Sequence, residues 1–374
     1  MRPPKISATA ARRIAGAAAI VSVAFLAACT PPTPKPVVTG APEITKGTVR
    51  VGAVVGDLDA QLQAEAVVLA LRARGFDAQL STPRSRAGWG TVEALEALEA
   101  KSLEVFVTGA APLAAQVPAT AASSSAGGAG SAPASSNASE APNSTEGSIA
   151  TATEGQQSTS GTSEPAVPVP TDASAAITAA GSVLPDGSAV ASTSLGDRRL
   201  ALAVAPNFAG LHTLRSVSDA AKQCPEAVLA ATTVWAASWK AGFGERTGCG
   251  PARVQRVTDT DGVISGLLDG SAQIGVVHSS DPELADDGVA VMEDPDRTLA
   301  ADPLISVVDS RRVGQDAIDV LNKVAGAASP DEWSMLRRLD DGVSAAQRQV
   351  DLREWMLERG VIDKNASTPS PTGT

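Results

Sequence analysis

The alternation of strand-like and helix-like segments in residues 48–107 constrains the fold more than any other feature. Short apolar runs such as TVRVGAVV fit buried strands, and the segments between them have the apolar spacing of helices. Strands that alternate with helices form a parallel sheet, so this part predicts an α/β lobe. The predicted elements are strands at 48–55, 76–80 and 103–107 and helices at 62–74 and 91–100.

The same alternation returns beyond residue 175, which predicts a second α/β lobe and a helical C-terminal part. A short helix is expected near Ala175, and the segment LPDG at 184–187 is typical of a turn. The further predicted strands are 200–204, 227–232, 254–257, 274–277, 289–293 and 303–308, and the helices are 217–223, 236–242, 261–269, 314–325, 330–340 and 345–359.

A change of composition interrupts the first lobe. Residues 118–170 consist mostly of Ser, Ala, Gly, Thr and Pro, and such a segment cannot bury enough apolar surface to offset its ordering entropy. We therefore expect a disordered insert there. The predicted division is a signal peptide (1–28), a Pro-rich tether (29–46), lobe 1 (47–117), the insert (118–170), lobe 2 (171–280), the rest of lobe 1 (281–363) and a disordered tail (364–374).

The N-terminal segment has the three zones of an export signal. A positive region precedes the apolar run 14–25, and Leu26-Ala27-Ala28-Cys29 follows it. This ending resembles the lipobox of bacterial lipoproteins, which implies lipidation of Cys29 and a chain anchored on the extracytoplasmic face of the cell membrane. The alternatives are a plain secretory signal and a transmembrane helix, for which the apolar run is short.

Two further cysteines, Cys224 and Cys249, would then lie outside the cytoplasm, where disulfides persist. Their spacing is not the CxxC of a redox or metal site. We expect a structural disulfide between them, and the alternative is a pair of buried free thiols.

Composition also bounds the function. The formal net charge of −11 disfavours nucleic acid as a partner, because binding to phosphates depends on clustered Lys and Arg. With two histidines, no Walker loop, no nucleophile elbow and no HExxH motif, the sequence supports neither a metal site, nor a cofactor, nor an enzyme.

Several segments resemble the quaternary-amine substrate-binding proteins, which serve ABC importers of glycine betaine, carnitine and choline. They include GTVRVGAVV, LEVFVTGA, LLDGSAQIGVVHSSDPEL and VMEDPDR followed by ADPLISVV. The resemblance implies the type 2 periplasmic-binding fold, in which two α/β lobes trap a solute in the cleft between them. It also implies ABC permease subunits as partners and a monomeric chain without enzymatic activity.

On this resemblance, the cleft lies where the carboxyl ends of the strands converge. The ligand-binding candidates are Gly56, Asp57, Trp89, Thr108, Gly109, Thr233, Trp235, His278, Ser279 and Asp281. Several have structural alternatives: Asp57 can cap the next helix, Trp89 can cover one, and His278 can be a hydrogen-bonded loop residue. We expect Trp239, Trp333 and Trp355 to serve in packing.

The sequence departs from this family at its aromatic residues. The chain has no tyrosine, and Phe106 and Val107 stand where the family has Glu-Tyr before Thr-Gly. A quaternary ammonium is held by aromatic faces through cation–π attraction, and only Trp89 and Trp235 are expected at the cleft. This leaves two hypotheses: a solute-binding protein for a betaine-like molecule, or a non-transport envelope lipoprotein that keeps the fold as a sensor or interaction module.

Overall fold

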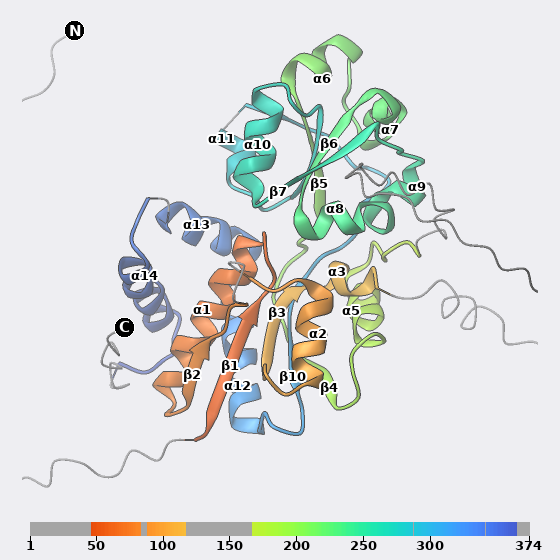
Figure 1. Cartoon of the computed structure of the whole chain (residues 1–374). Coiled ribbons are helices and arrows are strands. Elements are labelled where there is room, and N and C mark those ends of the chain that lie inside the picture. Colours follow the sequence, from red (N-terminus) through yellow and green to blue (C-terminus); the bar gives the residue numbers. More distant parts are fainter. Residues whose placement is uncertain (1–45, 84–87, 117–166, 287, 341, 365–374) are drawn as a thin grey trace, which may run out of the picture. The chain divides into compact units, whose positions relative to one another are not determined.

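The computed structural model describes residues 46–83, 88–116, 167–286, 288–340 and 342–364, which all belong to one compact unit, Ile44–Thr374 (Figure 1). Cys29, the expected signal peptide and nearly all of the expected tether, insert and tail lie outside these residues. No helix among the described residues is long and apolar enough to cross a membrane.

The first sheet has the strand order β2-β1-β3-β10-β4. Its first three strands are parallel, and β10 runs antiparallel to both β3 and β4. We call this sheet and its helices lobe 1. Its strands are β1 (Thr48–Ala53), β2 (Asp77–Leu80), β3 (Val105–Gly109), β4 (Ser188–Thr193) and β10 (Leu304–Asp309).

The second sheet repeats this arrangement in the order β7-β6-β8-β5-β9. Strands β7, β6 and β8 are parallel, and β5 runs antiparallel to β8 and β9. We call this sheet and its helices lobe 2. Its strands are β5 (Leu200–Val204), β6 (Val228–Thr232), β7 (Arg253–Val257), β8 (Ile274–His278) and β9 (Ala290–Val291).

Helices cover both sheets, and the cores are apolar. In lobe 1, α1 packs against α12, α13 and α14. In lobe 2, α10 packs against β6 and β8, and α8 against β6 and β7. The lobe 1 helices are α1 (Leu58–Ala73), α2 (Thr91–Glu99), α3 (Ala110–Ala114), α5 (Ala173–Gly181), α12 (Gln315–Ala325), α13 (Pro330–Asp340) and α14 (Ala345–Glu358). Those of lobe 2 are α6 (Pro206–His212), α7 (Val217–Gln223), η1 (Cys224–Glu226), α8 (Thr233–Trp239), η2 (Lys240–Gly244), α9 (Glu245–Thr247), α10 (Thr260–Leu268) and α11 (Glu283–Asp286).

Two crossover segments, 194–199 and 292–303, connect the lobes. They lie side by side and antiparallel where they meet, since Asp302 N donates to Arg198 O at 2.9 Å and Leu200 N donates to Ala300 O at 3.0 Å. Arg199 and Ala301 also form an isolated antiparallel bridge. The two lobes are therefore joined by a short two-stranded ribbon, and residues on this ribbon lie close to both lobes.

The two-lobed α/β fold was predicted correctly, but two lobe boundaries were not. Strand β4 belongs to lobe 1 and β9 to lobe 2, so the chain enters lobe 2 after Thr193 and leaves it after Val291, rather than at 171 and 280. The segment SAVAST of β4 lacks a run of large apolar residues, and its extended form comes from pairing with β10. Helices α3 and α6 were also not predicted.

The predicted insert also ends too late. Val169 is buried in the lobe 2 core, and its carbonyl accepts a hydrogen bond from Arg246 Nη1 at 2.5 Å. Its apolar side chain has packing partners there, so the described residues 167–170 are part of the folded unit.

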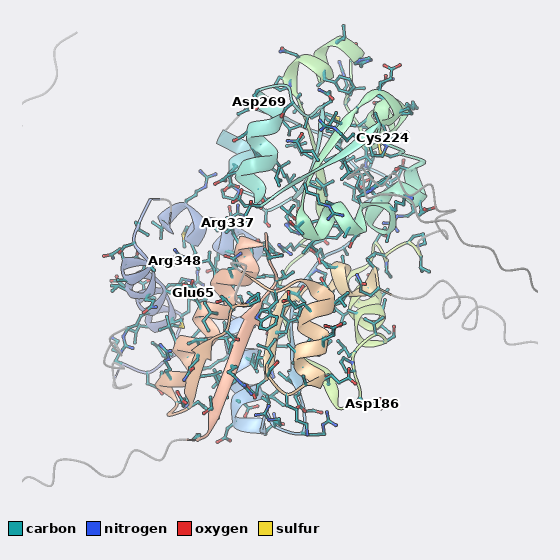
Figure 2. All side chains as sticks on the ribbon, in the orientation of Figure 1. Glu65, Asp186, Cys224, Asp269, Arg337 and Arg348 are labelled. Atoms are coloured by element: carbon teal, nitrogen blue, oxygen red, sulfur yellow. A yellow bond between two sulfur atoms is a disulfide. The ribbon has the colours of Figure 1, made fainter. Side chains whose placement is uncertain are left out.

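The predicted disulfide between Cys224 and Cys249 is present. Their Cα atoms are 5.3 Å apart, and the bond joins η1 to the loop after α9 (Figure 2). Both cysteines are buried in the core of lobe 2. The bond therefore ties together two segments of the same lobe.

Candidate functional site

The loop after β1 lies against lobe 2. Gly56 has a positive φ of 76°, and a Cβ built there would lie 2.8 Å from the carbonyl oxygen of Thr258 and 3.0 Å from Cβ of Thr232. Both neighbours belong to lobe 2. Only glycine fits this position without strain, because its backbone conformation and the nearby lobe both exclude a side chain.

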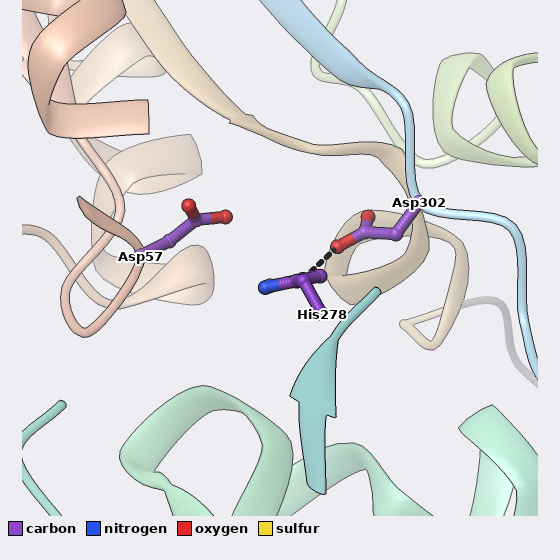
Figure 3. A group of neighbouring side chains, drawn as sticks. All are labelled: Asp57, His278 and Asp302. Atoms are coloured by element: carbon purple, nitrogen blue, oxygen red, sulfur yellow. Dashed lines mark hydrogen bonds and ion pairs between the residues drawn. The ribbon is translucent and has the colours of Figure 1, made fainter. Parts of the chain in front are cut away.

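Beside this contact, seven charged or titratable side chains form one buried group, which we call the junction cluster. They come from both lobes and from both crossover segments. The members are Asp57, Asp59, Arg198, His278, Asp281, Asp302 and Arg337. Figure 3 shows three of them, Asp57, His278 and Asp302, converging from different segments.

Arg198, on the first crossover, lies at the centre of the junction cluster and is 1% exposed. Its Nη2 donates to both carboxylate oxygens of Asp57 at 2.8 Å, and its Nε donates to Asp59 at 3.2 Å. Its Nη1 donates to the carbonyl and the carboxylate of Asp302 at 3.1 and 3.2 Å. One guanidinium thus connects the start of α1 with the second crossover.

His278, the last residue of β8, brings lobe 2 into the cluster. Its Nε2 lies 2.8 Å from Asp302 Oδ2, and its Nδ1 lies 3.1 Å from Nη2 of Arg198 (Figure 3). Because the guanidinium can only donate, this geometry fits an imidazole that accepts at Nδ1 and donates from Nε2 to Asp302.

Arg337, on α13, makes the second bridge between the lobes (Figure 2). Its Nη1 lies 2.5 Å from Asp281 of lobe 2 and 3.5 Å from Asp59 of lobe 1. Its Nη2 donates to both oxygens of Glu283 at 2.8 and 2.7 Å. Asp281 therefore anchors α13 to the end of β8.

Backbone N–H groups also hold three of the carboxylates in place. Asp57 caps α1, since Ala60 N donates to its Oδ1 at 3.1 Å, so this residue both caps the helix and pairs with a cation. Asp302 Oδ1 accepts from Ala111 N at 2.8 Å. Asp281 Oδ2 accepts from His278 N at 2.7 Å. These bonds orient the acidic groups toward the junction.

Carboxylates outnumber cations in the junction cluster. Four aspartates face two guanidinium groups and one imidazole, and Glu283 adds a fifth carboxylate at the edge. Burial raises the pKa of Asp59 above its ordinary value, and the charges of Asp57 and Asp281 add to this effect against Arg198 and Arg337. Asp57 differs, because Arg198 and His278 outweigh its burial and lower its pKa. The cluster has a net attraction for positive charge.

The pKa of His278, like that of Asp59, is raised above its ordinary value. Burial and the charge of Arg198 each lower it, but the hydrogen bond to Asp302 and the charges of Asp57 and Asp302 outweigh them. Uptake of a proton would make Nδ1 a donor facing the guanidinium, so a protonated ring would have to turn toward Asp57.

Asp57, His278 and Asp302 have ligand atoms within 4.8 Å of one another, a spacing that a metal ion can use. The guanidinium of Arg198, however, already lies within hydrogen-bond distance of all three side chains. The residues therefore hold an internal cation in place of a metal.

The predicted site residues divide into two groups. Gly56, Asp57, Gly109, His278 and Asp281 lie in or against the junction cluster; a Cβ on Gly109 would lie 2.1 Å from Asp302 Oδ1. Trp235 is buried in the lobe 2 core, and its ring meets His278 edge-on at 6.2 Å. It lies in α8, which starts directly after β6 and therefore earlier than the helix predicted at 236–242.

The other predicted residues lie outside the junction cluster. Trp89 packs against the lobe 1 core, and its Nε1 donates to Ser81 O at 2.8 Å. Thr108 is buried in β3, Thr233 begins α8, and Ser279 is exposed with its N–H bonded to Arg199 O. Trp333 and Trp355 pack together in the lobe 1 core, as expected.

Sequence reasoning missed Asp59, Arg198, Asp302 and Arg337. Arg198 and Asp302 lie just before β5 and β10, the two antiparallel strands that follow the crossovers. A charged residue just before a strongly apolar strand is the sequence pattern that could have identified both as junction residues. Nothing local marks Arg337, because its partners lie far away in the sequence.

The chain has the two-lobed α/β fold of type 2 periplasmic-binding proteins. One similar solved structure is described as a glycine betaine/carnitine/choline ABC transporter, at 16% identity and a TM-score of 0.51, over 84% of this chain and all of that one. Another is a choline-binding protein of an ABC transporter in complex with choline, at 12% identity, a TM-score of 0.51, and 84% and 89% coverage.

A third is the glycine/betaine/L-proline-binding protein ProX from Borrelia burgdorferi, at 10% identity and a TM-score of 0.51, over 83% of this chain and 93% of that one. At such identities the likeness shows the fold alone. No family model matches the chain, and no curated protein matches it in sequence.

Proposed function

We propose that this chain is a substrate-binding lipoprotein of an ABC importer, anchored outside the cell through Cys29, that captures a small polar solute by closing its lobes. Three features support the proposal: the fold, the lipobox-like ending at Cys29, and the convergence of polar residues at the junction. Its partners would be the permease subunits, and its lipid anchor would keep it at the membrane.

One observation carries the choice of solute. Buried carboxylates outnumber cations where the lobes meet, and such a site favours a positively charged guest. The candidate ligand contacts are Asp57, His278 and Asp281, flanked by Gly56 and Gly109. Because these groups accept hydrogen bonds, they suit a cation that carries N–H donors.

A betaine-like quaternary ammonium has no N–H and needs aromatic faces. Among the described residues, Trp235 lies edge-on to His278, whereas Trp89 packs in the lobe 1 core. A quaternary amine would therefore find at most one aromatic ring at the junction. We place primary ammonium and guanidinium solutes ahead of betaine, choline and carnitine.

A thermal-shift panel tests this function. A solute present at a hundredfold excess over its Kd should stabilise the folded chain by about 2.7 kcal/mol. The panel contains agmatine, arginine, putrescine, betaine, choline, carnitine and proline, with sodium chloride matched for ionic strength. Stabilisation by one cationic solute supports capture, and a flat response to the whole panel in folded protein contradicts it.

The second candidate function is the sensor or interaction module. It is favoured by the positions of Arg198 and Arg337, which already neutralise part of the junction while the lobes are in contact. A protein whose lobes stay closed without a guest would present a constant surface to a partner. X-ray scattering with and without each solute separates the two functions, because only a transport protein should change its radius of gyration.

The anchor has its own test. Wild-type chain expressed with labelled palmitate should take up the label, and Cys29→Ser should not. Label on the Cys29→Ser chain would show that the acyl group is attached to another residue. A wild-type chain without label would favour a plain secretory signal.

A further inference from the structure

We propose that Arg198 is a built-in cation that occupies a guanidinium-binding site between the lobes, and that the natural guest of this site is a solute with a guanidinium group. This inference rests on the proposed solute-binding function for its biological meaning, but the site itself is defined by contacts within the chain.

The first argument is the completeness of the hydrogen bonding. Every nitrogen of the Arg198 guanidinium donates to an acceptor of the junction cluster: Nε to Asp59, Nη1 to Asp302, and Nη2 to Asp57 and His278. The arrangement around Nη2 spans both oxygens of Asp57 at 2.8 Å. The three nitrogens of the planar guanidinium thus each face a different carboxylate, an arrangement that suits a spread set of donors better than a point charge.

The second argument is that two of the acceptors have further bonds that do not involve Arg198. Ala60 N donates to Asp57 and Ala111 N donates to Asp302, and these bonds would help to orient both carboxylates without the guanidinium. Their enforced proximity to one another makes the empty site strongly attractive to a replacement cation, since buried carboxylates without a partner are costly.

The third argument is the place of Arg198 in the chain. It stands on the crossover segment 194–199, whose backbone bonds to the second crossover at Arg198 O itself. Its side chain reaches groups of lobe 1, lobe 2 and the second crossover together. A guanidinium in this site therefore holds the lobes closed, whether it belongs to the chain or to a solute, and a solute must compete with Arg198.

Chemical rescue tests the site in the full-length chain. Arg198→Ala removes the guanidinium and should lower the thermal midpoint by several degrees; the matched control is Arg199→Ala, which removes a neighbouring arginine paired with the surface residue Asp197. Methylguanidinium at millimolar concentration should restore most of the lost midpoint in Arg198→Ala. Tetramethylammonium and sodium chloride should not. Wild type and Arg199→Ala, in which Arg198 still competes for the site, should respond to methylguanidinium much less than Arg198→Ala does.

Equal recovery with every salt, or no recovery with methylguanidinium, would overturn the proposal. If Arg198→Ala does not fold, refolding with and without methylguanidinium gives the same comparison. Arg198→Lys, which keeps the charge but loses the fork, should then show a midpoint below that of wild type; a lysine variant as stable as wild type contradicts a site selective for guanidinium.

The outcomes separate this inference from the proposed function. If methylguanidinium raises the midpoint of Arg198→Ala but no solute raises that of wild type, the guanidinium site is supported and solute capture is rejected. If a solute raises the midpoint of wild type but methylguanidinium does not rescue Arg198→Ala, solute capture is supported and the site at Arg198 is rejected.

Discussion

The lobe cores and the junction cluster are buried to a similar degree, but they are built from opposite chemistry. The core of lobe 1 is formed by side chains such as Leu71, Leu98 and Phe106, whereas the junction consists of carboxylates, guanidinium groups and an imidazole. Apolar burial stabilises in almost any well-packed arrangement, at about 25 cal/mol per Å². Buried charges stabilise only in one arrangement, in which each finds its partner. The cores therefore supply stability, and the junction specifies how the lobes meet.

The largest expected effects come from two neighbouring residues of α13, one from each environment. Leu336→Ala removes a buried lobe 1 side chain and should lower the free energy of unfolding by about 2–5 kcal/mol. Arg337→Met removes the cation that pairs with Asp281 and Glu283 and should cost about 3–5 kcal/mol. Urea denaturation measures both.

A double-mutant cycle with Asp281→Asn then distinguishes the two environments. The effects of Arg337→Met and Asp281→Asn should be strongly non-additive, because each removes the same ion pair. Leu336→Ala and Asp281→Asn should add to within about 0.5 kcal/mol. Additivity in both cycles would show that the junction is not a coupled unit.

The same contrast explains what could be predicted from the sequence. Both sheets were predicted because their strands are local apolar runs, of which LALAV at 200–204 is the clearest. Such a run can be recognised from the local sequence alone. Strand β4 was missed because its small polar residues become a strand only through pairing with β10. Local patterns predict cores well, since each element carries its own apolar face.

The junction was predicted only in part. Asp57, His278 and Asp281 were found because they follow strands at the edge where ligands of α/β sheets bind. Their partners Arg198 and Arg337 lie 141 and 56 residues away from Asp57 and Asp281, respectively, so only the folded chain brings them together. The surroundings of the two tryptophans were not predicted either: Trp89 packs against the lobe 1 core, and Trp235 is buried in the lobe 2 core beside His278.

The next effect is confined to lobe 2. Replacing both Cys224 and Cys249 with serine removes a link between residues 25 positions apart, and the loop-entropy model gives a loss of about 3 kcal/mol. Urea denaturation under oxidising conditions measures it. The coupling between Arg337 and Asp281 should stay unchanged in the serine variant; a changed coupling would mean that lobe 2 packing controls the junction.

A smaller effect is expected where the lobes touch. Gly56→Ala introduces a methyl group against the Thr258 carbonyl at a positive φ, so it should both strain the backbone and hold the lobes apart. Gly47→Ala is the matched control, because Gly47 also has a positive φ, of 89°, but nothing lies within 4 Å of its Cβ position. Each should cost about 1–2 kcal/mol of backbone strain. Only Gly56→Ala should raise the radius of gyration, and equal radii would place the lobe contact elsewhere.

The smallest effect is a pH dependence that arises in the junction and not in the cores. His278 faces Asp57, Asp302 and Arg198, and the two carboxylates raise its pKa in the folded chain despite burial and the guanidinium. A group that binds its proton more tightly when folded stabilises the fold below its unfolded pKa, and this contribution is lost as the pH rises through the folded value. Stability should therefore decline as the pH rises above about 6.5, the ordinary pKa of histidine.

His278→Gln should flatten this decline, because the amide cannot take up the proton. His212→Gln, on the exposed helix α6, is the control and should keep the slope of the parent chain. Asp59 also has a raised pKa because of its burial, so it contributes a slope of the same sign at pH values above the ordinary carboxyl pKa of about 4. Thermal midpoints measured across the range decide the matter: parallel curves for His278→Gln and wild type would assign the pH dependence to groups outside the junction cluster.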